Sequence, residues 1–84
     1  MNSHRENFSL VRALGLAIQE RRLKLNLSQK ELAEEAGVDR AYISNIEQAK
    51  RNPSLSAMRN LATGLRTKLS RLIGTAERIE NELD

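Results

Sequence analysis

Residues 28–47, with the sequence SQKELAEEAGVDRAYISNIE, decide the fold of this 84-residue chain. Ser28 and Glu31 have the spacing of a capping box, in which each side chain accepts a hydrogen bond from the other residue's backbone N–H, so a helix is expected to begin here. Gly37 tolerates the left-handed conformation that ends many helices, and Asp39 is a suitable cap for the helix that follows. Two helices joined by so short a turn predict a helix-turn-helix.

Apolar residues flank the predicted turn at positions that would face one shared core. Ala33 is small at the place where a steep crossing brings the two helices closest, and a larger side chain there would push them apart. The alternative is an αα-hairpin with only a packing role. The apolar positions are Leu32, Ala36, Val38, Ile43 and Ile46.

The rest of the chain also has a helical periodicity, without the alternation of a strand. We expect a first helix after the cap candidate Ser9, to about residue 26. A fourth helix would begin at a cap on Asn52 or Ser54, and a fifth would begin at Thr67 or Ser70.

These elements predict an all-α fold, a compact four- to five-helix bundle with a helix-turn-helix. Residues 1–8 are expected to form a flexible N-terminal arm. Residues 9–73 would form the helix-turn-helix domain, and residues 74–84 a C-terminal helical extension.

Composition excludes several classes of site. The chain has no cysteine, which excludes a disulfide framework and a thiolate metal site. Its one histidine, His4, is too few for a histidine-ligated metal site and is not placed for a catalytic triad. No apolar run approaches the roughly 20 residues that cross a bilayer, and no signal-peptide pattern opens the chain. We therefore predict a cytoplasmic protein that is not an enzyme and has no metal, no cofactor, no membrane partner and no small-molecule substrate.

Charge is distributed unevenly along the chain. Its 14 basic and 11 acidic side chains give a net charge of +3. Residues 1–76 hold 13 of the basic and 7 of the acidic residues, whereas residues 77–84 hold one basic and four acidic residues. This pattern favours a basic body that meets a polyanion and an acidic end that faces away, although solvated helix faces are the alternative.

Two stretches, LSQKELAEEAGVDRAYISNIE (27–47) and RNPSLSAMRNLA (51–62), resemble the lambdoid Cro- and repressor-type (Xre-like) helix-turn-helix regulators. The segment DRAYISNIE (39–47) is particularly similar to restriction–modification controller proteins and small prophage repressors. The resemblance covers about residues 9–73. It implies that double-stranded DNA is the partner and that the third helix enters the major groove.

The resemblance also implies roles for individual residues on and around the third helix. The guanidinium of Arg40 matches the acceptors of guanine, Asn45 suits adenine or phosphate, and the methyl group of Ala41 suits thymine. The alternatives are that Arg40 only pairs with Asp39 and that Tyr42 only seals the edge of the core. The implied base-reading residues are Arg40, Ala41, Ser44 and Asn45, and the implied phosphate contacts are Gln29, Lys30, Tyr42, Gln48, Lys50, Arg51 and Asn52.

Two further sets of residues are assigned structural roles. Arg22 and Glu47 match an ion pair by which such proteins hold the recognition helix at its angle. At the C-terminus, Leu69, Leu72, Ala76, Ile79 and Leu83 recur at the spacing of a helix–helix seam. We predict that Ala76, Ile79 and Leu83 form a homodimer contact; frayed terminal turns are the alternative.

Together these features predict a sequence-specific DNA-binding transcriptional regulator that binds a near-palindromic operator as a homodimer. Two alternatives use the same helical bundle with a protein partner. One is an antitoxin that binds both its operator and a toxin, and the other is a protein-interaction adaptor.

Overall fold

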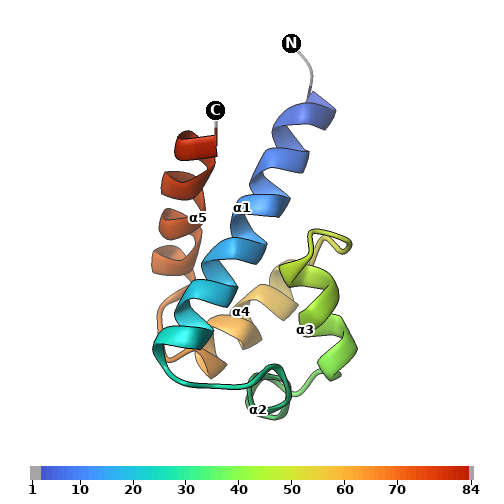
Figure 1. The fold of residues 1–84 in the computed structure, drawn as a ribbon, viewed down its shortest axis with the longest axis vertical. Coiled ribbons are helices and arrows are strands. Elements are labelled where there is room, and N and C mark those ends of the chain that lie inside the picture. The colour runs from blue at the N-terminus through green and yellow to red at the C-terminus, as the bar shows by residue number, and fades with distance from the viewer. Residues whose placement is uncertain (1–2, 84) are drawn as a thin grey trace.

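The computed structural model describes residues 3–83, and the side chains of residues 9–83. These residues form five helices and no strand, and none of the described helices is long and apolar enough to cross a membrane. The predicted all-α bundle with a helix-turn-helix is confirmed. The helices are α1 (Ser3–Lys24), α2 (Gln29–Ala36), α3 (Arg40–Glu47), α4 (Leu55–Gly64) and α5 (Leu69–Leu83) (Figure 1).

The long helices α1 and α5 run side by side in opposite directions, and the three shorter helices gather near one end of them (Figure 1). In this view α1 lies between α5 and α3, and it packs against both. Helix α2 packs against α3 and α4. The helix-turn-helix therefore contacts the long helix α1 directly through α3. Its other helix, α2, packs on α4, which in turn contacts α5.

The core joins side chains from every helix. Burying each large aliphatic side chain contributes roughly 1.5–3 kcal/mol relative to leaving it exposed. Because these side chains come from different helices, their burial stabilises the bundle rather than any single helix. The large side chains that are fully buried are Ile18, Leu32, Ile43, Ile46, Leu61 and Leu65.

Serine caps fix the starts of α2 and α4. The N–H of Glu31 donates to Ser28 Oγ at 3.0 Å and the N–H of Ser28 donates to Glu31 Oε1 at 2.9 Å, so the predicted capping box is present. Of the two candidates for α4, Ser54 is the cap, and its Oγ accepts from the N–H of Ala57 at 3.1 Å. These bonds set where the helix-turn-helix and its supporting helix begin.

Two predicted helix starts are wrong. Helix α1 begins at Ser3 rather than after Ser9, so the predicted flexible arm is helical over residues 3–8. That stretch contains no glycine or proline, and nothing in it prevents the helix from extending past Ser9. The first two residues of the arm lie outside the described residues. Helix α5 begins at Leu69, between its two predicted starts.

The predicted C-terminal dimer contact is wrong for Ala76 and Ile79, which are buried within their own chain. Their exposed fractions are 0% and 8%, and they belong to the same core cluster as Leu72. The physical reason is that α1 lies beside α5 and covers its apolar side, where Leu16 and Leu23 line the same hollow as Ile79. Leu83, at the end of α5, is 41% exposed.

Candidate nucleic-acid interface

Gly37 makes the turn between α2 and α3. Its backbone is left-handed, with φ 70° and ψ 34°, and the N–H groups of Gly37 and Val38 donate to the carbonyls of Glu34 and Ala33 at 3.4 and 3.0 Å. Asp39 then occupies the cap position of α3, but its side chain makes no capping hydrogen bond, so the predicted capping role is wrong for the side chain. Backbone hydrogen bonds close the turn without the Asp39 side chain, and the Asp39 carboxylate is exposed.

Arg22 in the last turn of α1 and Glu47 at the end of α3 form a buried ion pair. Arg22 Nε donates to Glu47 Oε2 at 2.7 Å and Nη2 donates to Oε1 at 3.0 Å, with the two side chains 9% and 2% exposed. Arg22 Nη1 also donates to the Leu27 carbonyl at 2.8 Å. Hydrogen bonding to Glu47 raises the pKa of the Arg22 guanidinium above its ordinary value, although burial opposes the shift. These bonds tie α3 to α1.

Gly15 is a second point of attachment between α1 and α3, and it was not predicted from the sequence. A Cβ at this position would overlap the backbone carbonyl oxygen of Ile46 and lie 3.1 Å from that of Glu47. A residue with no side chain is therefore required for α1 to approach α3 this closely. The available signal was a glycine within an apolar helical pattern, which often marks a close approach of two backbones.

Gln29, the first residue of α2, connects the buried ion pair to the exposed surface. Its Nε2 donates to Glu47 Oε1 at 3.1 Å, and its Oε1 accepts from Arg40 Nη1 at 3.1 Å. The Gln29 side-chain amide thus bridges Glu47, the last residue of α3, and Arg40, its first residue. Gln29 was predicted to contact phosphate, and its bridging position was not predicted, because the separation in sequence gives no sign that the three side chains meet.

The four residues predicted to read bases share one face of α3. Helical spacing places them together, opposite the two buried isoleucines of this helix. Past the helix end, the exposed Gln48 donates from Nε2 to Ser44 Oγ at 2.9 Å. The base-reading candidates are Arg40 and Ala41, which are exposed, and Ser44 and Asn45, which are half-buried.

Tyr42 lies at the edge of the core. Its side chain is half-buried and packs against the core cluster, and the guanidinium carbon of Arg51 lies 5.1 Å from the centroid of its ring. That distance allows a cation–π contact, which holds Arg51 near α3. This packing matches the alternative role for Tyr42, and its phosphate contact stays a prediction.

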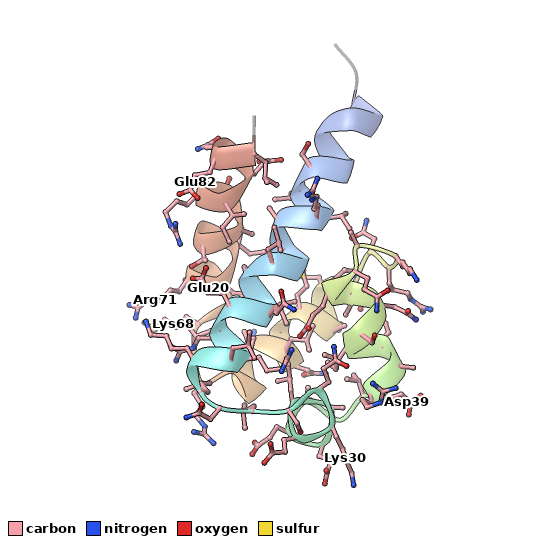
Figure 2. All side chains as sticks on the ribbon, in the orientation of Figure 1. Glu20, Lys30, Asp39, Lys68, Arg71 and Glu82 are labelled. Carbon is pink, nitrogen blue, oxygen red and sulfur yellow. The ribbon has the colours of Figure 1, made fainter. Side chains whose placement is uncertain are left out.

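The remaining phosphate candidates stand at both ends of α3. Figure 2 shows Lys30 pointing outward from α2, on the side of the molecule where Asp39 marks the start of α3. The loop between α3 and α4 carries Lys50, Arg51 and Asn52, all exposed. Cationic side chains therefore flank the exposed face of α3, as a helix placed between two phosphate strands requires.

A helix-turn-helix family model, HTH_3, matches residues 18–72 of the chain. The chain belongs to this family. Control protein C.SmaI of Serratia marcescens is 42% identical over 57 residues, which are 68% of this chain and 67% of that protein. The immunity repressor of Bacillus phage phi105 is 35% identical over 69 residues, 82% of this chain but 48% of the repressor, so the chain spans about half of that relative.

Solved structures agree with this family membership. The restriction-modification controller protein C.AhdI from Aeromonas hydrophila has a TM-score of 0.72 and 35% identity, and the match covers 74% of this chain and 94% of that chain. The clp gene regulator ClgR from Corynebacterium glutamicum, at 23% identity and a TM-score of 0.84, shares the fold.

The family match and its relatives confirm the resemblance to Xre-like regulators inferred from the sequence. This helix-turn-helix protein is a DNA-binding transcriptional regulator, and its family consists of regulators rather than enzymes.

Proposed function

We propose that the protein binds a near-palindromic DNA operator as a homodimer and inserts the first turns of α3 into the major groove. The observation that carries this proposal is the fixed position of α3, which is tied to α1 by the Arg22–Glu47 pair while Arg40 and Ala41 remain exposed. A recognition helix needs both properties, since its base contacts require a set angle and free side chains.

Arg40 is the proposed principal base reader. Its Nη1 is held at 3.1 Å by Gln29 Oε1, which leaves the rest of the guanidinium fork exposed toward solvent. A bidentate contact of arginine with guanine O6 and N7 contributes about 1–3 kcal/mol of discrimination against other bases. Ala41, Ser44 and Asn45 would complete the base-reading set from the same face of α3.

The phosphate contacts would supply most of the affinity without reading sequence. We assign this role to the exposed cations at the two ends of α3, with Gln48, Asn52 and the hydroxyl of Tyr42 as neutral partners. The free N–H groups at the start of α2 add a favourable dipole for a phosphate beside Gln29. The observed affinity should therefore fall steeply as salt rises.

A two-fold homodimer supplies the symmetry that a near-palindromic operator requires. One α3 helix reads only one half-site, and two such helices must lie about 34 Å apart, one turn of DNA, to read both half-sites from one side. The phage relative is an immunity repressor, which supports repression as the regulatory effect of this chain.

The test is a selection of binders from random DNA duplexes at near-physiological salt, followed by sequencing of the enriched fraction. A two-fold symmetric motif with half-sites about 10 base pairs apart is the expected result. A single unsymmetric motif would overturn the dimer, and salt-sensitive binding with no enriched motif would overturn sequence-specific recognition. The Arg40→Ala variant serves as the matched control, since it should lose preference at one position of each half-site.

A further inference from the structure

Two adjoining hollows lie where the end of α1 meets the start of α5. The first has a volume of about 230 Å³ and is lined by both helices, and the second, of about 430 Å³, lies beside the turn between α4 and α5. Arg21, Thr67 and Arg71 line both, so we treat the two as one site, the cationic hollow. Its cations, six of the 14 basic residues of the chain, are Arg21, Lys24, Arg66, Lys68, Arg71 and Arg78.

Most of these cations have no carboxylate partner. Of the described residues that line the cationic hollow, only Glu20 is acidic, and its Oε1 lies 3.9 Å from Arg78 Nη2. Arg78 also pairs with Glu82 at 3.1 Å. Among residues 9–83, the other five cations form no salt bridge. Because like charges gathered in one place repel each other, the hollow favours an anionic ligand.

Backbone carbonyls fix the position of Arg21 within the hollow. Its Nε donates to the Leu65 carbonyl at 2.9 Å, its Nη2 donates to the Arg66 carbonyl at 3.1 Å, and the residue is half-buried. These acceptors hold the guanidinium without neutralising its charge, and they leave Nη1 to contact an anion. A planar guanidinium held in this way suits the oxygens of a phosphate group.

The start of α5 also favours an anion. Its first turn contains no acidic side chain. Lys68 and Arg71 stand there instead, where the positive end of the helix dipole disfavours cations. Figure 2 shows these two side chains close together, on the side of the molecule away from α3. A bound anion would offset both their mutual repulsion and their repulsion by the helix dipole.

We propose that the cationic hollow binds a small oligophosphate, an anion of two or three linked phosphate groups. One phosphate group carries a charge of about −1.5 to −2 at pH 7, so two or three are needed to balance the five cations that lack a carboxylate. The two hollows give such a chain room, and Arg21 and Arg71 stand where it would pass from one to the other. This site does not involve α3, so it stands or falls independently of operator binding.

Duplex DNA fits the cationic hollow less well than a small anion does. A duplex presents its phosphates on an extended convex surface, whereas these cations converge on a hollow between helices. A duplex bound at α3 would also be remote from the hollow, since α1 lies between α3 and α5 (Figure 1).

Isothermal titration calorimetry of the full chain with inorganic triphosphate, at near-physiological ionic strength, tests the proposal. We expect one site per chain and an affinity at least about tenfold higher than for inorganic phosphate, because a single phosphate group meets only part of the charge. No binding at about 1 mM triphosphate would overturn the proposal. Equal affinities for phosphate and triphosphate would overturn the oligophosphate as the ligand.

Two arginine variants with the same change in net charge locate the binding. Arg71→Gln should weaken triphosphate binding by at least about tenfold, because Arg71 lines both hollows. Arg12→Gln is the matched control, since this exposed arginine of α1 stands nine residues before Arg21, roughly 13 Å along the helix and beyond the screening length. Its affinity should stay within about twofold of the wild type. Equal weakening by the two variants would show that only net charge matters and would overturn the site.

Two further probes distinguish the sources of the phosphate groups. Adenosine triphosphate binding at least as tightly as inorganic triphosphate would support a nucleotide, and weaker binding would support an inorganic oligophosphate; both results keep the site. A duplex of unselected sequence is the third probe. If Arg71→Gln weakens duplex binding about tenfold while triphosphate does not bind, the surface contacts DNA and the proposal is overturned.

Discussion

The side chains on the two sides of α3 differ in burial and in hydrogen bonding. Toward the core, Ile43 and Ile46 are at most 1% exposed, and the Glu47 carboxylate binds Arg22 through two hydrogen bonds. On the outer side, Arg40 and Ala41 are exposed, and Arg40 makes one hydrogen bond, to Gln29. The inner side fixes the angle of the helix, and the outer side keeps its donors available. Stability and recognition therefore depend on different residues of the same short helix.

The largest effect should come from breaking the inner side at its ion pair. Glu47→Leu leaves the Arg22 guanidinium buried without its carboxylate, and removal of one partner from such a pair costs about 3–5 kcal/mol. We expect the free energy of unfolding to fall by that amount. Urea denaturation measures it as a lower midpoint with an unchanged slope.

The matched control for this prediction removes both charges. Arg22→Met combined with Glu47→Leu leaves no unpaired buried charge, so most of the lost stability should return. A loss below about 1 kcal/mol in the single variant would mean that water reaches Arg22 and that the pair behaves like a surface ion pair.

A smaller loss should come from Gly15, where α1 approaches α3. Gly15→Ala forces a Cβ against the backbone carbonyl of Ile46, and overpacking of this kind costs about 1–3 kcal/mol. Gly74→Ala is the matched control, because its added Cβ meets open space and a helix favours alanine over glycine by about 1 kcal/mol. Thermal unfolding should therefore shift in opposite directions for the two variants, and shifts of the same sign would contradict the close approach at Gly15.

On the outer side, substitutions should change recognition and leave stability nearly unchanged. Arg40→Ala should weaken binding to the selected operator by about 1–3 kcal/mol and relax specificity at one base position. Lys30→Ala should weaken binding to all sequences alike and make the salt dependence shallower. Fluorescence anisotropy on operator and mismatched duplexes distinguishes the two. Equal loss on every duplex from Arg40→Ala would reassign Arg40 to phosphate.

The local signals of the helix-turn-helix were sufficient to predict its fold. The capping box at Ser28, the left-handed Gly37 and the apolar spacing all depend on a few neighbouring residues, and the structure has each of them. The start of α1 was predicted wrongly because Ser9 has the side chain of a cap, but the helix extends through it.

Contacts between distant residues accounted for the errors at the candidate site. Ile79 was predicted to lie free for a partner, since nothing in its own segment shows that α1 covers it. Gln29 was placed on phosphate, because only the folded chain brings its amide between Glu47 and Arg40. Residue chemistry thus predicted which side chains matter, and packing decided where they point.

The smallest effect should come from Glu31, whose exposed carboxylate contrasts with the buried one of Glu47. Hydrogen bonds from the backbone and side chain of Ser28 lower the pKa of Glu31 below its ordinary value of 4.5. The ionised form is therefore favoured by folding, so its contribution is present above that ordinary value and is lost as the pH falls through the lowered pKa. Glu31→Gln can still accept the bond from Ser28 but cannot titrate. The difference in melting temperature between wild type and Glu31→Gln should accordingly be constant near neutral pH and shrink below about pH 4.5. A difference that persists unchanged into acid would show that the charge of Glu31 contributes nothing to the cap.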